Sequence, residues 1–114
     1  MNTVNDLIDQ LIEVRDSLFE KVNDSNLPMP VREAALTEHD EVSHRLRVLL
    51  AAALKTEVSE LKVPLEKVRD AREELAGVLK TADKAAAVTK GVARFLTIVD
   101  KLLDQVKVAA AAVG

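Results

Sequence analysis

The fold is decided by AAAVTKGVARFLTIVDKLLDQVKVAAAAV, the stretch that spans residues 85–113. Its apolar residues recur at alternating steps of three and four, a spacing that keeps one seam of a helix against a partner. The seam consists of Ala85, Val88, Val92, Phe95, Val99, Leu102, Val106, Ala109 and Val113. Because most helical stability comes from burying such a face, this helix requires packing partners from the rest of the chain or from a second copy.

The preceding residues show similar patterns. An apolar stripe in residues 3–24 contains Val4, Leu7, Ile8, Leu11, Ile12, Leu18, Phe19 and Val22. A seam in residues 30–55 contains Val31, Ala35, His39, Val42, Leu46, Leu49 and Ala53. A less regular rhythm continues through residues 57–80 and includes Val58, Leu61, Leu65, Val68, Leu75 and Leu79. We therefore predict helices near residues 3–24, 30–55, 57–80 and 82–112.

Local signals mark several helix ends. Thr3 followed by Asp6 resembles a capping box at the start of the first helix. The segment 23–30, NDSNLPMP, combines turn-forming side chains with two prolines and ends this helix. Because the linker is short, the first two helices are expected to form an antiparallel hairpin. The last helix is expected to begin just after Thr81 rather than after Gly91.

The middle of the chain leaves two alternatives open. Pro64 costs about 3 kcal/mol inside a helix and disfavours the α conformation of the preceding residue. Either the second helix stops between residues 55 and 63, or one long helix passes through with a kink at Pro64. We favour a kink or a short break with the two segments roughly in line.

These patterns predict a single all-α domain over residues 1–114, an elongated helical hairpin or bundle of three to four helices with coiled-coil-like seams. A chain this short has difficulty covering all of its seams, so we expect oligomerisation to complete the fold. A homodimer is favoured because two-fold symmetric dimers are the commonest oligomers. The residues expected at or next to this interface are Val92, Phe95, Val99, Leu102 and Val106.

The amino-acid composition limits the class of protein and the compartment in which we expect it. Hydrophobic residues make up 48% of the chain and charged residues 31%, as in long helices rich in Ala, Leu, Glu and Lys. The chain has no cysteine, which excludes disulfides and thiolate metal sites. It also lacks the basic start and apolar run of a secretory signal, and its longest uncharged apolar runs are far too short to span a membrane. We therefore expect a soluble cytoplasmic protein.

Charge is distributed unevenly along the chain. Residues 1–44 hold ten acids and three bases, a net charge of −7, whereas residues 45–114 hold nine acids and thirteen bases, a net of +4. The predicted acidic face comprises Asp6, Asp9, Glu13, Asp16 and Glu20, and the predicted basic face comprises Lys90, Arg94 and Lys101. The acidic face either is simply solvated or docks a basic partner. Sparse cations, few aromatic residues and a pI near 5.4 argue against nucleic-acid binding.

The segment 38–44, EHDEVSH, holds both histidines and is the only stretch worth testing for metal chemistry. Glu41 and His44 have the Glu-x-x-His spacing of di-iron bundles, which need two such pairs and two further Glu projecting inward. These two residues lie off the apolar seam, so we expect His39 to bond an acid on a neighbouring helix and His44 to be exposed. No serine has an assignable catalytic partner, and the isolated glycines form no phosphate loop. We expect no enzyme, metal or cofactor.

Two classes of function remain. The favoured one is a non-enzymatic protein–protein interaction module, such as a helical adaptor, a chaperone-like protein or a small assembly component, that acts through its apolar seams. The alternative is a protein whose amphipathic helices open onto a lipid or other apolar surface. The last helix has the apolar seam and cationic outer face that lipid binding requires, but the acidic first helix would be repelled by anionic lipid.

Overall fold

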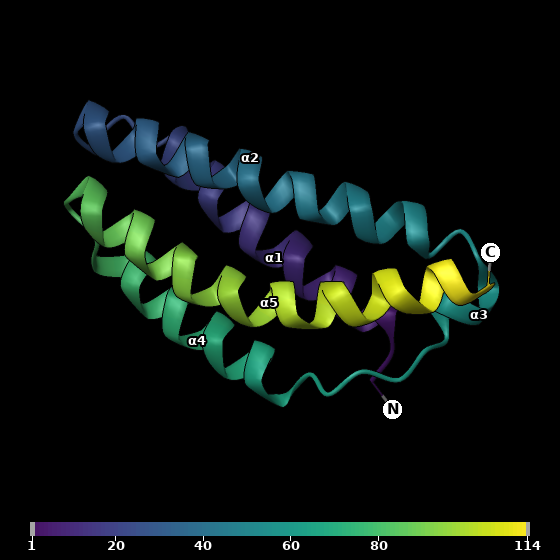
Figure 1. Ribbon diagram of the computed structural model, residues 1–114. Coiled ribbons are helices and arrows are strands. Elements are labelled where there is room, and N and C mark those ends of the chain that lie inside the picture. Colours follow the sequence, from purple (N-terminus) through teal and green to yellow (C-terminus); the bar gives the residue numbers. More distant parts are fainter. Residues whose placement is uncertain (1, 114) are drawn as a thin grey trace.

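The computed structural model describes residues 2–113, with side chains through Ala112, and is 82% helical. Within this range the helices are α1 (Val4–Val22), α2 (Met29–Ala52), α3 (Thr56–Ser59), α4 (Glu66–Thr81) and α5 (Ala85–Val113) (Figure 1). The predicted all-α class is confirmed. Four helices are long and α3 is a single turn. Val113, predicted on the seam, lies outside the described side chains.

The long helices form two antiparallel hairpins, α1/α2 and α4/α5 (Figure 1). In the first hairpin Arg32 Nε donates a hydrogen bond of 2.9 Å to the Val22 carbonyl across the turn. In the second, Arg94 Nη1 lies 3.2 Å from Glu74 Oε1. The hairpin predicted for the first two helices and the helix boundary near Thr81 are both confirmed.

The two hairpins stack as layers, with α1 beside α4 and α2 beside α5. Helices that face each other across the layers run in the same direction. Arg45 of α2 pairs with Asp100 of α5, and further along both helices Lys55 Nζ donates to the carbonyl of Ala110. Residue numbers therefore increase in the same direction along α2 and α5. The result is a four-helix bundle with extents of 46 × 22 × 17 Å.

The seam of α5 is buried by the chain itself. All five residues expected at an interface between copies, Val92, Phe95, Val99, Leu102 and Val106, lie inside the bundle. They join one hydrophobic core with Val4, Leu7 and Leu11 of α1. A second copy is therefore not needed to cover this seam, and these side chains could meet one only if the bundle opened. Oligomerisation itself stays a prediction.

The connection between α2 and α4 differs from the sequence-based prediction. α2 ends at Ala52, α3 adds one turn, and the chain then crosses the end of the bundle in an extended conformation. There the N–H of Val63 donates to the Asn2 carbonyl, while the N–H of Val4 donates to the Leu61 carbonyl, both at 3.1 Å. Pro64, which has no N–H to donate, fits this extended segment.

The prediction that the segments before and after Pro64 are roughly in line is therefore wrong. α4 runs back along the bundle, antiparallel to α2 (Figure 1). The physical reason is burial in the connection itself, because Val58, Val63 and Leu65 all pack into the core. An in-line helix would leave these three side chains without partners.

Two local features determine where α1 begins and how closely α4 and α5 pack. At the start of α1 the Asp6 carboxylate accepts the backbone N–H of Thr3 at 2.7 Å, as in the predicted capping box. Gly91 lies inside α5 and faces Leu75 and Val78 of α4. A Cβ at this position would meet Leu75 Cδ1 at 3.1 Å and Val78 Cγ1 at 3.2 Å. The missing side chain thus permits the close packing of the second hairpin.

Candidate functional site

A groove of about 570 Å³ lies between α4 and α5 on the outer face of the second hairpin. The buried side chains of Leu75 and Phe95 contribute to its floor, together with Gly91. The other lining residues are Ala71, Glu74, Val78, Ala87, Lys90, Arg94, Thr97 and Ile98. Small residues from both helices keep the centre of the groove hollow, and the lining is mainly apolar. We call this surface the α4/α5 groove.

The rim of the α4/α5 groove is charged. Arg94 and Glu74 form an ion pair across it, but both side chains are largely exposed, so the pair contributes at most about 1 kcal/mol. Lys90 is exposed one turn before Arg94. Lys101 is exposed two turns after Arg94 and continues the same row on α5. Two of the three residues of the predicted basic face therefore line the groove, and the third extends it.

The outer face of the first hairpin also exposes apolar side chains. Phe19 of α1 is 53% exposed, and its ring lies 5.7 Å from that of His39 on α2. Leu36 and Leu50 of α2 are 46% and 48% exposed. Leu36 is one turn from His39, and Leu50 is two heptads beyond Leu36, so all three lie on the same side of α2. We call this surface, made by Phe19, Leu36 and Leu50, the α1/α2 face.

Only some residues of the predicted acidic face are free of hydrogen bonds and ion pairs with other residues. Asp6 caps α1, and Glu13 Oε2 lies 2.7 Å from Nη1 of Arg72 on α4. Asp16 lies 3.3 Å from its neighbour Arg15. Asp9 and Glu20 are exposed. The exposed acids lie opposite the buried Leu7, Leu11 and Leu18, on the same side of α1 as Glu13. The partner of Arg72 thus comes from another helix rather than from the adjacent acids of α4.

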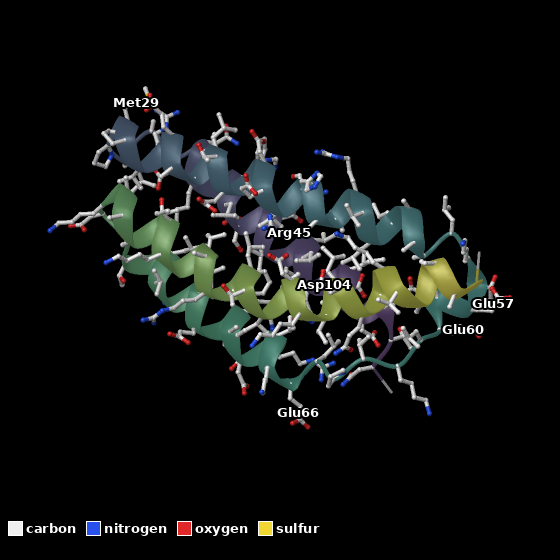
Figure 2. All side chains as sticks on the ribbon, viewed as in Figure 1. Met29, Arg45, Glu57, Glu60, Glu66 and Asp104 are labelled. Atoms are coloured by element: carbon white, nitrogen blue, oxygen red, sulfur yellow. The ribbon has the colours of Figure 1, made fainter. Side chains whose placement is uncertain are left out.

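On the side of α2 that lies away from the α1/α2 face, Arg45 links α2 to α5 (Figure 2). Its Nε and Nη2 donate to the two carboxylate oxygens of Asp100 at 2.7 and 3.2 Å, and its Nη1 donates to Glu41 Oε2 at 3.0 Å. The hydrogen bond to Asp100, more than the bond to Glu41, raises the pKa of Arg45. Two-point bonding of this kind fixes the orientation as well as the distance between the helices.

Glu38 lies one turn before Glu41, and the effect of its charge on the stability of the fold can be tested through its pH dependence. Burial raises the pKa of Glu38 above its ordinary value of 4.5, and the negative charge of Glu41 adds to the effect. A raised pKa in the folded state means that stability present at low pH is lost as the pH rises through that pKa.

We expect Glu38→Gln to be more stable than the wild type at neutral pH and no more stable below the unfolded-state pKa. Urea unfolding at both pH values measures this, with exposed Glu33→Gln as control; a pH-independent difference would contradict it.

The two histidines have different surroundings. His39 contacts Phe19 and lies 3.3 Å from Asp40 of its own helix, so the acid on a neighbouring helix that we expected is not its partner. His44 is exposed, as predicted, while Glu41 bonds Arg45. Among the described residues 2–113, no three His, Cys, Asp or Glu side chains come together as a metal site would require. The same part of the chain contains no helix whose length and apolarity would let it cross a bilayer.

Sequence reasoning missed the α4/α5 groove. The available signal was the set of small residues Ala71, Ala87 and Gly91 beside charged positions on two helices. Their spacing alone does not show that the helices meet at these points. Comparison of the chain with protein-family models, curated proteins and solved structures gives no match.

Proposed function

We propose that the protein is a non-enzymatic protein–protein interaction module and that it receives an apolar helix in the α4/α5 groove. The observation that carries the proposal is the groove itself, an apolar hollow of about 570 Å³ on the outside of the bundle. Concave, mainly apolar surfaces of this volume with a few polar groups at the rim are the usual form of a binding site. The seam residues of α5 serve the core, and only Phe95 among those expected at an interface also contributes to the floor of the groove, so the proposed site lies beside the seam on the side of α5 that faces α4.

The shape of the groove suits a helix. Two antiparallel helices with small residues between them allow a third helix to approach closely and to insert side chains spaced three and four residues apart. Lys90 and Lys101 on the rim favour acidic residues beside the inserted apolar ones. A partner helix with an apolar stripe and acidic flanks therefore fits both the hollow and its rim.

Two synthetic amphipathic helices test this proposal. They share Leu and Phe along one stripe, and their polar faces carry either Glu or Lys. In backbone NMR spectra of labelled protein, we expect the Glu peptide to shift the signals of Ala71, Gly91 and Ile98 and to bind several-fold more tightly than the Lys peptide. The proposal is wrong if neither peptide perturbs these signals at millimolar concentration.

The alternative function, binding to a lipid surface, is tested by adding anionic vesicles instead of the peptides. The apolar seam of α5 is buried, so lipid binding through it requires the bundle to open. Cosedimentation with vesicles, together with loss of the core signals of the folded protein, would favour the lipid function. A protein that stays free of vesicles while it binds the Glu peptide supports the interaction module.

A further inference from the structure

We propose that the bundle opens along the seam between α1 and α4 while the pair α2/α5 stays closed. The proposed function uses the closed bundle, so this inference goes beyond it and describes a movement built into the fold. Three observations support it: a hollow between α1 and α4, two buried polar atoms without hydrogen bonds, and the unequal contacts that join the two hairpins.

The seam between α1 and α4 is incompletely packed. A hollow of about 30 Å³ lies between the two helices. Its lining includes Val14 and Ser17 of α1 and Leu75 and Leu79 of α4. Atoms that border a hollow lose the dispersion contacts that close packing provides. This seam therefore gains less free energy from closing than a completely filled one would.

Two buried polar atoms on this seam lack hydrogen bonds. Among the described side chains of residues 2–112, Gln10 Oε1 and Arg72 Nε are buried and have no hydrogen-bond partner. Arg72 lines the hollow, and Gln10 lies one turn before Val14 on the same side of α1. A polar atom buried without a partner costs free energy, which is recovered when water reaches it. Because opening of the seam admits water, both atoms favour the open form.

The contacts that join the two hairpins are unequal. On the α2/α5 side, Arg45 donates two hydrogen bonds, of 2.7 and 3.2 Å, to the carboxylate of Asp100. On the α1/α4 side, Arg72 Nη1 lies 2.7 Å from Glu13 Oε2, and the Glu13 side chain is more than half exposed. A two-point contact fixes the orientation of two helices, whereas a single ion pair exposed to water stabilises little. The α2/α5 side is therefore the more firmly held of the two.

Backbone contacts at the start of α1 determine which end of the seam moves. The N–H of Val4 donates to the Leu61 carbonyl, and the N–H of Val63 donates to the Asn2 carbonyl. Arg69, near the start of α4, donates from Nη2 to Asn2 Oδ1 at 3.0 Å. These bonds tie the beginning of α1 to the segment that leads into α4. The hollow lies further along both helices, so their far ends are the ones that separate.

Opening of this kind leaves both hairpins intact. The α4/α5 groove stays assembled, because its two helices belong to one hairpin. The side chains of Leu11, Leu18 and Leu75, which are buried in the closed bundle, become accessible. The movement thus gives access to the apolar interior without loss of the groove.

Single cysteines measure the opening, because the chain has none of its own. Val14→Cys and Leu79→Cys place a thiol on either side of the hollow, and Val42→Cys and Val99→Cys place one on α2 and one on α5. All four native side chains are at most 3% exposed. Reaction with Ellman's reagent is followed in native buffer. Each rate is compared with the rate that the variant's own unfolding equilibrium, measured in urea by circular dichroism, predicts.

We expect the thiols at positions 14 and 79 to react at least about tenfold faster than global unfolding allows, because they respond to the local opening. The thiols at positions 42 and 99 should react only at the rate of global unfolding. Below the unfolding transition, the rates at positions 14 and 79 should also depend weakly on urea, since a local opening exposes less surface than global unfolding.

A double variant removes the two unpaired atoms. Gln10→Leu with Arg72→Met should raise the urea midpoint and slow the reaction of the thiol at position 14. The reason is that apolar side chains need no hydrogen-bond partner in the closed seam. Gln105→Leu with Arg47→Met makes the same two kinds of change at exposed positions of α5 and α2, and it should alter neither quantity.

Three results would overturn the inference. Thiols at positions 14 and 79 that react no faster than global unfolding allows exclude a separate opening of the α1/α4 seam. Reaction above that rate at position 42 or 99 shows that the α2/α5 pair does not stay closed. A double variant at positions 10 and 72 whose urea midpoint falls or stays the same shows that the two atoms do not favour the open form.

Discussion

Val99→Asp should unfold the protein or leave it only marginally stable. Val99 lies at the middle of α5 with no exposed surface, and no buried polar or charged residue occurs among the described residues to pair with a new carboxylate. An unpaired charge in such a site costs about 3–5 kcal/mol, a large part of the about 5–15 kcal/mol that stabilises a typical domain. Urea unfolding followed by circular dichroism measures the loss.

Lys101→Asp is the control, because Lys101 is exposed two residues further along the same helix. Surface changes of this kind usually alter stability by less than about 0.5 kcal/mol. The pair of variants also tests where the seam of α5 lies. If Val99→Asp converts an oligomeric wild type into a folded monomer of unchanged stability, Val99 lies at an interface between copies and not in the interior of the bundle.

Phe95→Ala should be the most destabilising truncation in the core. Phe95 is the largest of the fully buried side chains, and it lies on α5 beneath the α4/α5 groove. Removing a buried Phe ring costs about 3–5 kcal/mol, because the lost burial is compounded by the cavity left behind. The midpoint of thermal or urea unfolding should therefore fall sharply.

Phe19→Ala provides a matched comparison at the only other Phe of the chain. Phe19 is 53% exposed, so truncation removes about half of the burial of a Phe side chain and should cost about 1 kcal/mol or less. Equal losses for the two variants would contradict the division between core and outer face described above.

The sequence predicted the elements of the fold correctly wherever the signal was local. The apolar steps of three and four gave the long helices, and the turn residues and prolines of residues 23–30 gave the first hairpin. Thr3 and Asp6 marked the start of α1, and the end of α4 at Thr81 followed from the place where the next seam begins. These signals depend on residues within a few positions of one another, whose geometry the helix itself fixes.

Pro64 shows where local information stops. Its presence excludes an ordinary helix at that point, but it fits both a kinked helix and a reversal of the chain. The reversal is fixed by contacts with the start of α1, more than fifty residues away in the sequence. The backbone of the connection bonds Asn2 and Val4, and Val58 and Val63 enter a core to which all four long helices contribute.

The same limit applies to the candidate site. The sequence by itself determined that the chain forms long amphipathic helices, which face of each is apolar, and that Lys90, Arg94 and Lys101 lie on the outside of the last one. Only the tertiary structure decided that α4 and α5 approach at Gly91 and leave a groove beside those cations, and that α1 lies beside α4. The physical reason is that helical periodicity follows from neighbours in the chain, whereas several arrangements of four helices can bury the same seams. The choice among them depends on side chains that meet only after the chain has folded.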